Sequence, residues 1–396
     1  MDILNAVENL YPKMVERRRH IHRHPELSTK EDQTCAYIME QLTEAGIEEV
    51  INIPDGGVIA YIRGNKSGKT VMLRADIDAL PIQEPTHNLS KERVCVSEND
   101  GVMHACGHDA HTAMLLTAGE VLNANKEELN GNVLLVFERG EEGGGNIWKI
   151  LEYFHEHDVK YDVCFGMHVE QKLDTGKFAM SAGPVNAGAM PLHFRVTGRG
   201  GHASRPDLCV NPIDCMLELI SEIHKIRMKH VSPFEQLTIS ICKLDAGTKG
   251  NIIPETAEFQ GSARYFSAEN VYKPFKEQIV HIIKGLEESY GCTIEDLCRK
   301  GAIPVVNDAG AATVAQNAVK KVLGADALCE ETPTMGSESF SRFMELAPGC
   351  YGNLGVRNPE VGSGAEIHNP LFDIDERAMV TGAAAHIAFA VEYLNQ

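Results

Sequence analysis

Residues 101–112, GVMHACGHDAHT, place His104, Cys106, His108 and His111 within one short stretch. Thiolate and imidazole groups are typical ligands of zinc and of neighbouring divalent ions. Because Cys106 stands two residues before His108, both side chains could face one cleft. The same cysteine could instead be a catalytic nucleophile with a histidine as its base. The spacing within this stretch leaves both hypotheses open.

Further candidate ligands lie in four short motifs, RADIDALP, ERGEEGGG, GMHV and GAEIHNP. Most of these motifs follow predicted strands, and α/β enzymes bind ligands at the carboxyl ends of their strands. Taken singly, each motif is more often structural, because lone histidines are usually hydrogen-bonded and acidic pairs are usually solvated. The candidates in these motifs are Asp76, Asp78, Glu141, Glu142, His168 and His368.

The candidates taken together favour a metal centre. A thiol nucleophile gives no reason for the paired carboxylates or for the later histidines, whereas a metal centre uses all of them. Glu141 and Glu142 precede three glycines, and adjacent carboxylates in such a turn can divide the work, one binding a metal and one acting as general base. A metal-stabilised binding or regulatory protein without turnover is a third hypothesis.

Three apolar runs, at 71–75, 133–137 and 163–169, are predicted to be the strands that position these side chains. Their nearly continuous apolar character is typical of a sheet that is covered on both faces. A helical pattern from about 112 to 129 separates the first two runs. The strand–helix–strand order predicts an α/β fold with a mainly parallel sheet.

The pattern changes at about residue 187, where the order becomes β-α-β-β-α. This order is typical of a small α+β domain of about 110 residues inserted into a larger one. We therefore expect an α/β protein of two domains. The larger domain is discontinuous, over 1–186 and 301–396, and the smaller covers 187–300.

The formal net charge of −19 disfavours nucleic acid and anionic membranes as partners. No apolar run approaches the ~20 residues that span a bilayer, and the first residues lack the pattern of a signal peptide. The 11 cysteines are odd in number and without paired spacing. We therefore expect a protein of the reducing cytoplasm, without nucleic-acid or membrane partners.

Eight motifs occur in an order that resembles one known family. They are LRADIDALPIQE, GVMHACGHDAHT, FERGEEGGG, GMHV, GGHASRP, GNIIPETAEFQGSAR, MGSESF and IHNPLFDIDE. Between about Arg18 and Glu376 the chain resembles the amidohydrolase branch of the aminoacylase/carboxypeptidase-G-type metallopeptidases. This branch contains hippurate hydrolases, N-acyl-amino-acid deacylases and indole-acetyl-amino-acid hydrolases. The resemblance implies that the larger domain is catalytic and that the smaller is a lid or dimerisation domain.

The resemblance also implies a centre of two divalent metal ions, manganese or zinc, with cobalt and nickel as alternatives. Cys106 would bridge the ions and Glu141 would be the general base. Asp78 would orient a group at the metal, while Asp76 replaces a histidine ligand of other branches and would support the ligands from behind. The other implied ligands are His108 and His168 for one ion, and Glu142 and His368 for the second.

The implied reaction is hydrolysis of the amide bond of an N-acyl amino acid, a small-molecule substrate. His202 in GRGGHAS matches a histidine that reaches into the active site of a partner subunit and polarises the scissile carbonyl. Asn251, Arg264 and Gly336 match substrate-binding positions, and Arg264 suits a bidentate grip on a carboxylate. A homodimer through the smaller domain, or a higher oligomer, is therefore expected. The presence of Glu141 and His202 argues against a protein that only binds.

One motif departs from the family pattern. Glu138, Arg139 and Gly140 stand where the sequence Gln-Pro-Ala is usual, directly before the catalytic pair. The pair itself is retained, but two charges are added and a proline is lost. We expect this change to bear on substrate preference more than on the chemistry. His104 and His111 match family positions that are not ligands, and we expect them to be structural.

Overall fold

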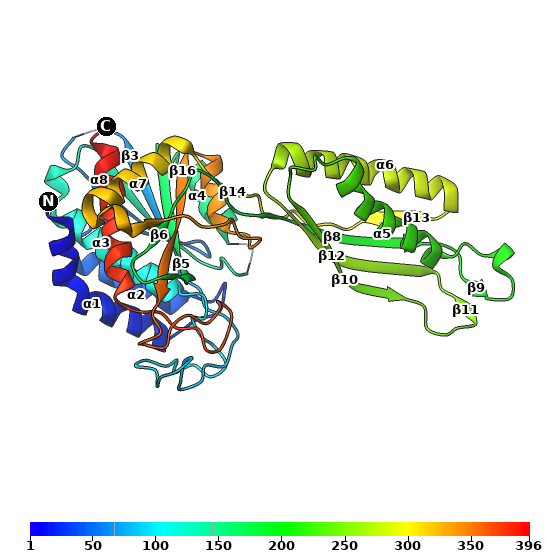
Figure 1. Ribbon diagram of the computed structural model, residues 1–396, viewed down its shortest axis with the longest axis horizontal. Helices are drawn as coiled ribbons and strands as arrows, with labels where there is room; N and C mark the ends of the chain where they lie inside the picture. Colours follow the sequence, from blue (N-terminus) through cyan, green and yellow to red (C-terminus); the bar gives the residue numbers. More distant parts are fainter. Residues whose placement is uncertain (67, 144–145) are drawn as a thin grey trace. The chain divides into compact units, whose positions relative to one another are not determined.

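The computed structural model describes residues 1–66, 68–143 and 146–396. The chain forms two compact units (Figure 1). Unit 1 contains Met1–Gly183, Asn307–Thr332 and Arg342–Gln396, and unit 2 contains Pro184–Val306 and Pro333–Ser341. The α/β class predicted from the sequence is confirmed. The roles expected of the two parts, catalysis and a lid or dimerisation, stay predictions.

Unit 1 is built on an eight-stranded sheet with the order β1-β2-β4-β3-β5-β16-β6-β15. The central neighbours β4, β3, β5 and β16 run parallel, and β1 and β2 pair antiparallel at one edge. The strands are β1 (Glu49–Ile53), β2 (Gly57–Arg63), β3 (Thr70–Asp76), β4 (Asn132–Glu138), β5 (Val163–Asp174), β6 (Phe178–Ala179), β15 (Leu328–Cys329) and β16 (Gly349–Arg357).

In the described part of unit 1, six helices accompany the sheet. They are α1 (Ile3–Arg23), α2 (Asp32–Glu44), α3 (His108–Ala124), α4 (Ile147–Glu156), α7 (Ala309–Leu323) and α8 (Ala378–Leu394). Helices α1, α3 and α8 pack against one another over the sheet, and α7 packs on α8. Helix α3 begins at His108, four residues before the start predicted from its apolar pattern, because polar residues of its first turn are buried as well.

The central strands carry the site residues to one edge of the sheet. Every residue of β3 from Val71 to Asp76 is buried, as expected of a strand covered on both faces. Because β3, β4 and β5 are parallel, their carboxyl ends lie at the same edge. Asp76 and Glu138 end two of these strands. The residues that follow them therefore meet at this edge.

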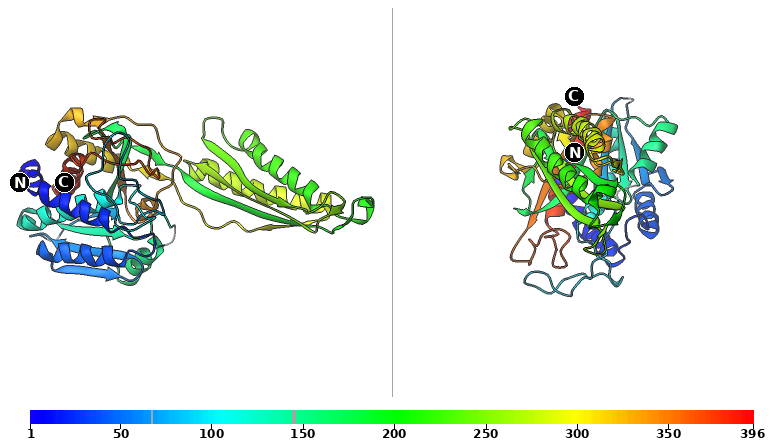
Figure 2. Two further views of the ribbon diagram at one scale, coloured as in Figure 1. Left: turned by 90° about the horizontal axis from the view of Figure 1, so that it is seen from below. Right: turned by 90° about the vertical axis from the view of Figure 1, so that its right-hand side faces the viewer.

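Unit 2 has a four-stranded antiparallel sheet with the order β10-β12-β8-β13. Helices α5 and α6 pack side by side and share its apolar core (Figure 2). The elements are β8 (Gly188–Thr197), α5 (Pro212–Lys229), β10 (Leu237–Ala246), β12 (Thr256–Tyr265), α6 (Lys273–Tyr290) and β13 (Thr293–Asp296).

Two small sheets complete the fold. Strands β9 (Gly201–His202) and β11 (Ile252–Ile253) pair antiparallel, beyond the end of the four-stranded sheet at which β12 begins (Figure 1). Strands β7 (Gly183–Asn186) and β14 (Val305–Asn307) form the other pair. Among the residues that the structure describes, no helix is long and apolar enough to cross a bilayer.

Candidate metal centre

Cys106 and His108 are held at the start of α3 by a backbone turn that needs glycine. Gly107, between them, has a φ of 86°. A Cβ at this position would lie 2.4 Å from Cγ2 of Val169 on β5. Any larger residue would therefore strain the backbone and collide with the neighbouring strand. The close approach brings the thiol and the imidazole to the carboxyl edge of the sheet.

One ring nitrogen of His108 is held by Asp78. The Nδ1–H of His108 donates to Oδ1 of Asp78 at 3.0 Å, which leaves Nε2 as the ring nitrogen that could bind a metal. This Nε2 is buried and forms no hydrogen bond with any described residue. The other oxygen of Asp78 accepts hydrogen bonds from the Ser28 hydroxyl, at 2.6 Å, and from the Glu142 N–H, at 3.0 Å. Asp78 thus orients a candidate ligand and fixes the chain at Glu142.

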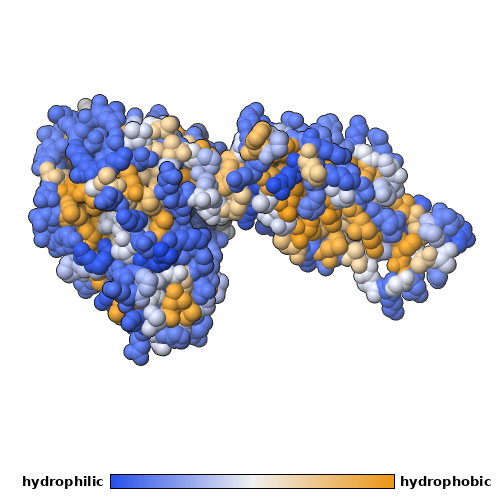
Figure 3. Space-filling view, in the orientation of Figure 1, coloured by the Kyte–Doolittle hydropathy of each residue, from blue (hydrophilic) through white to orange (hydrophobic). Residues whose placement is uncertain are grey.

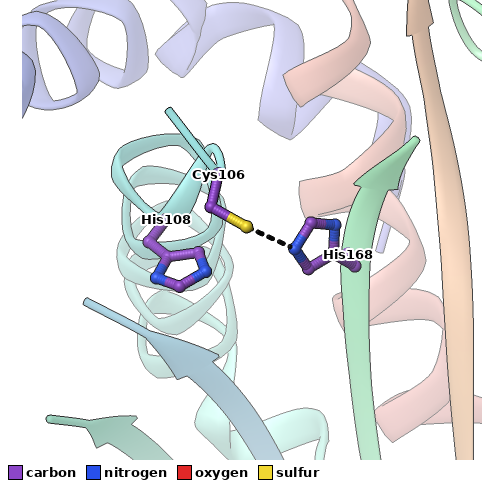
Figure 4. Close-up of side chains that lie close together, drawn as sticks. All are labelled: Cys106, His108 and His168. Carbon is purple, nitrogen blue, oxygen red and sulfur yellow. Dashed lines mark hydrogen bonds between the residues drawn. The ribbon is translucent and has the colours of Figure 1, made fainter. Parts of the chain in front are cut away.

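His168 on β5 faces Cys106 (Figure 4). Its Nδ1–H donates to the carbonyl oxygen of Val169 at 2.7 Å, and its Nε2 lies 3.2 Å from the Cys106 Sγ. Burial lowers the pKa of His168 to about 3, which keeps the imidazole neutral, the form that binds metals. Burial also raises the pKa of the Cys106 thiol. A thiolate at this position therefore needs a cation close by.

Glu142 and His368 form a second pair of candidate ligands. Nε2 of His368 lies 2.8 Å from Oε1 of Glu142. The backbone of His368 has a φ of 59°, and its N–H donates to the carbonyl oxygen of Ala105 at 2.8 Å. This bond joins the loop of His368 to the loop that precedes Cys106.

Two groups of candidate ligands overlap at one sulfur atom. The first group is Cys106 with His108 and His168, and the second is Cys106 with Glu142 and His368. A third group joins Glu141 to His108 and Glu142. Within each group the potential ligand atoms lie within 4.8 Å of one another. The structure therefore brings together all five predicted ligands and the predicted general base, with Cys106 between the two sets.

Asp76 and His111 form a further candidate group with His108, and Oδ2 of Asp76 lies 3.7 Å from Nε2 of His108. The Nδ1–H of His111 donates to Asp76 at 2.5 Å, and its Nε2 accepts the N–H of Val169 at 2.9 Å. Both ring nitrogens thus have hydrogen-bond partners, and His111 links β5 to β3; the structural role expected of it stays a prediction. Burial opposes ionisation of Asp76, but His108 and Arg74 outweigh it and hold the pKa of Asp76 well below its ordinary value.

The two charges that depart from the family pattern are buried and paired. Glu138 is fully buried and lies 2.6 Å from Nη2 of Arg74. Arg139 is 4% exposed and donates to Glu31 at 2.9 Å and to Asp32 at 2.8 Å. Both side chains therefore act inside unit 1 rather than adding charge to the surface of the site.

The candidate substrate residues of unit 2 form two separate groups. His202 on β9 lies beside Asn251, whose carbonyl oxygen accepts the N–H of Ala203 at 3.1 Å. Arg264 on β12 donates to the hydroxyl of Ser337, next to Gly336, at 3.2 Å. Strand β12 begins beside the first group and carries Arg264 near its other end. At about 3.4 Å per residue, the strand separates the two groups by roughly 27 Å.

Two overlapping groups of potential metal ligands thus lie beside a glutamate pair at the carboxyl edge of an α/β sheet, an arrangement suited to a metal-dependent hydrolase. Residues 72–392 match the family described as Peptidase family M20/M25/M40, and the chain belongs to this family. The resemblance read from the motifs is thus confirmed, and the protein is a metal-dependent hydrolase.

Three known proteins illustrate the similarity. Thermostable carboxypeptidase 2 of Saccharolobus solfataricus is 37% identical over 99% of this chain and 98% of its own length. N-acetylcysteine deacetylase of Bacillus subtilis is 32% identical over 98% of both chains. The solved structure of a dinuclear metal-binding peptidase of the M20 family, also from Bacillus subtilis, is 29% identical, with a TM-score of 0.83 over 98% of this chain and 99% of the other.

Proposed function

We propose that this protein binds two divalent metal ions and hydrolyses the amide bond of N-acyl amino acids, releasing a carboxylic acid and a free amino acid. The observation that carries the proposal is the shared Cys106 sulfur. It belongs both to the group with His108 and His168 and to the group with Glu142 and His368. The relatives support the substrate class, because a carboxypeptidase and an N-acetylcysteine deacetylase are both named for cleaving an amide bond beside an amino acid.

The donor set fits such ions. His108 and His168 each have one ring nitrogen held by the chain and the other directed at the centre, the usual arrangement of metal-binding histidines. The mixed thiolate, imidazole and carboxylate set suits manganese or zinc and also accepts cobalt or nickel. When bound, divalent ions of this kind acidify a water molecule and polarise the scissile carbonyl group.

Glu141 is the general base of the proposed reaction. It accepts the proton of the attacking water and then delivers it to the nitrogen of the leaving amine, which leaves poorly as an anion. The position of Glu141 in one group with His108 and Glu142 supports this role. Asp78 acts indirectly, because it orients His108 and holds the backbone of Glu142.

We further propose that the active enzyme is a homodimer in which His202 and Asn251 come from a second copy of the chain. A small substrate held through its carboxylate by Arg264 cannot also contact His202 of the same chain, because the length of β12 separates them. In the partner's site, His202 would stabilise negative charge on the carbonyl oxygen. Unit 2 would be the lid or dimerisation domain.

The surface of unit 2 supports a partner. Phe234 is 96% exposed and Met228 is 87% exposed, and Figure 3 shows further hydrophobic residues on this unit. Among the described strands β10 pairs only with β12, so its other edge is open to another chain. We place the enzyme in the reducing cytoplasm, because all 11 cysteines are free thiols.

Removal of the metal ions tests the proposed function. Thorough chelation should abolish the release of free amino acid from a panel of N-acyl amino acids, and manganese or zinc should restore it. Metal content is measured in parallel and should rise to two ions per chain as activity returns. Release of amino acid that persists in protein shown to be metal-free would contradict the proposal.

A further inference from the structure

The turn that carries Glu141 and Glu142 is anchored on both sides by carboxylates from other segments. The N–H of Gly140 donates to Oε1 of Glu31 at 2.8 Å. The N–H of Glu142 donates to Oδ2 of Asp78 at 3.0 Å. Glu141 lies between these two fixed points, so the position of its backbone depends on both.

Glu31 is built to be an anchor. It lies directly before α2, is fully buried and accepts three hydrogen bonds from N–H groups. Besides Gly140, these come from the backbone of Thr29, at 3.0 Å, and from Nε of Arg139, at 2.9 Å. A buried carboxylate is retained only where it is paired and hydrogen-bonded, as it is here.

Arg139, at the start of the turn, holds Glu31 in place by the hydrogen bond from its Nε. It immediately precedes Gly140, where the chain leaves β4 with a φ of 69°. A Cβ at position 140 would lie 3.1 Å from the side chain of Asn146, so the turn tolerates little rearrangement there. Ser28, in the same segment as Glu31, donates to Asp78 at 2.6 Å. Residues 28–31 therefore support both anchors of the turn.

We propose that Glu31, held by Arg139, is a positioning residue for the general base Glu141. This inference rests on the proposed function. Among the described residues, the N–H donors to the Glu31 carboxylate are Thr29, Arg139 and Gly140, none of them a proposed ligand, so Glu31 acts by fixing the backbone before Glu141. A displaced base transfers its proton more slowly, whereas substrate binding through other groups is little changed. The buried Arg139 thus helps to position Glu141, because it holds the carboxylate of Glu31.

The test is Glu31→Gln in the metal-loaded enzyme. Glutamine keeps the size of the side chain, but its amide group presents a donor to one of the three N–H groups. We expect kcat to fall by about 10- to 100-fold, with KM within about twofold and two metal ions retained. Asp32→Asn is the matched control, because Asp32 binds the same guanidinium from an exposed position. Its kcat should equal that of the wild type.

A second variant separates positioning from a purely structural role. In the double variant, Glu31→Gln combined with Arg139→Gln, the side-chain NH₂ at position 31 can donate to the side-chain oxygen at position 139. The side-chain oxygen at position 31 can still accept the N–H of Gly140. We expect kcat to recover by several-fold. Should Glu31→Gln not fold, Arg139→Lys replaces it, and its kcat should fall with unchanged metal content.

Unchanged kcat in a folded Glu31 or Arg139 variant would overturn the inference, as would a fall in kcat that only follows loss of metal. Glu141→Gln distinguishes the two levels of the argument. If this variant retains turnover, the proposed base is wrong. If it is inactive while Glu31→Gln is fully active, only the positioning role fails.

Discussion

Asp78 contacts two separate parts of the candidate centre. One oxygen holds His108, at the start of α3, and the other holds the backbone of Glu142, so groups from two separate segments share one carboxylate. Burial disfavours its charged form, but the bond from His108 outweighs burial and lowers the pKa of Asp78. The carboxylate is therefore ionised and can accept from all its donors.

Residue types predicted most of this centre, and spacing alone could not complete it. Cysteine, histidine and paired carboxylates suit a metal, and the motifs predicted each candidate ligand. His108 and His111, however, both lie in the first turn of α3, and spacing does not tell them apart. Only the structure shows that Nε2 of His111 already accepts the N–H of Val169. Glu31 carried no signal either, because it stands 109 residues from Gly140 in the chain.

At the scale of the elements, the site depends on the point at which α3 begins after the loop that contains Cys106. The sequence predicted the strands and the α/β order well, since buried strands have continuous apolar runs. It misplaced the start of α3, because His108, Asp109 and His111 of the first turn are polar residues, and their burial leaves no apolar pattern in the sequence. Gly107 allows this early start, because its left-handed backbone makes the turn between Cys106 and the first helical residue, His108.

Replacement of Gly107 by alanine should therefore damage the metal centre. Gly101→Ala is the matched control, because Gly101 also has a left-handed φ, of 75°, but has no atom within 4 Å of an added Cβ. Both variants should lose about 1–2 kcal/mol of stability from backbone strain, and Gly107→Ala should lose more, because its Cβ also collides with Val169. Only Gly107→Ala should also lose metal affinity, by roughly 10- to 100-fold. Urea unfolding and calorimetric metal titration measure the two effects. Equal metal affinity in the two variants would refute this account of Gly107.

At the scale of the whole molecule, the sequence predicted two parts but not their full composition. The change of pattern at about residue 187 lies close to the start of unit 2 at Pro184. Residues 333–341, which include Gly336, belong to unit 2 although they follow a long stretch of unit 1. Only a non-local contact explains this, such as the bond from the N–H of Ala187 to the carbonyl oxygen of Gly336. A pattern of apolar residues does not record such contacts.

The proposed exchange of His202 between subunits predicts complementation. His202→Ala and Glu141→Ala should each be nearly inactive alone. Mixed dimers that combine the two variants should recover activity, because one of their two sites then contains both native residues. The measurement is amino-acid release after the two variants are unfolded and refolded together, with each refolded alone as the control. Mixed dimers that form but stay inactive would show that His202 does not act in trans.

The central claim is that Cys106 joins two metal ions, and anomalous diffraction from crystals grown with manganese or zinc tests it most directly. The account predicts two anomalous peaks, each marking an ion within bonding distance of the Cys106 sulfur. One peak should also be bonded to His108 and His168, and the other to Glu142 and His368. A single ion, or two ions that do not share the sulfur, would contradict it.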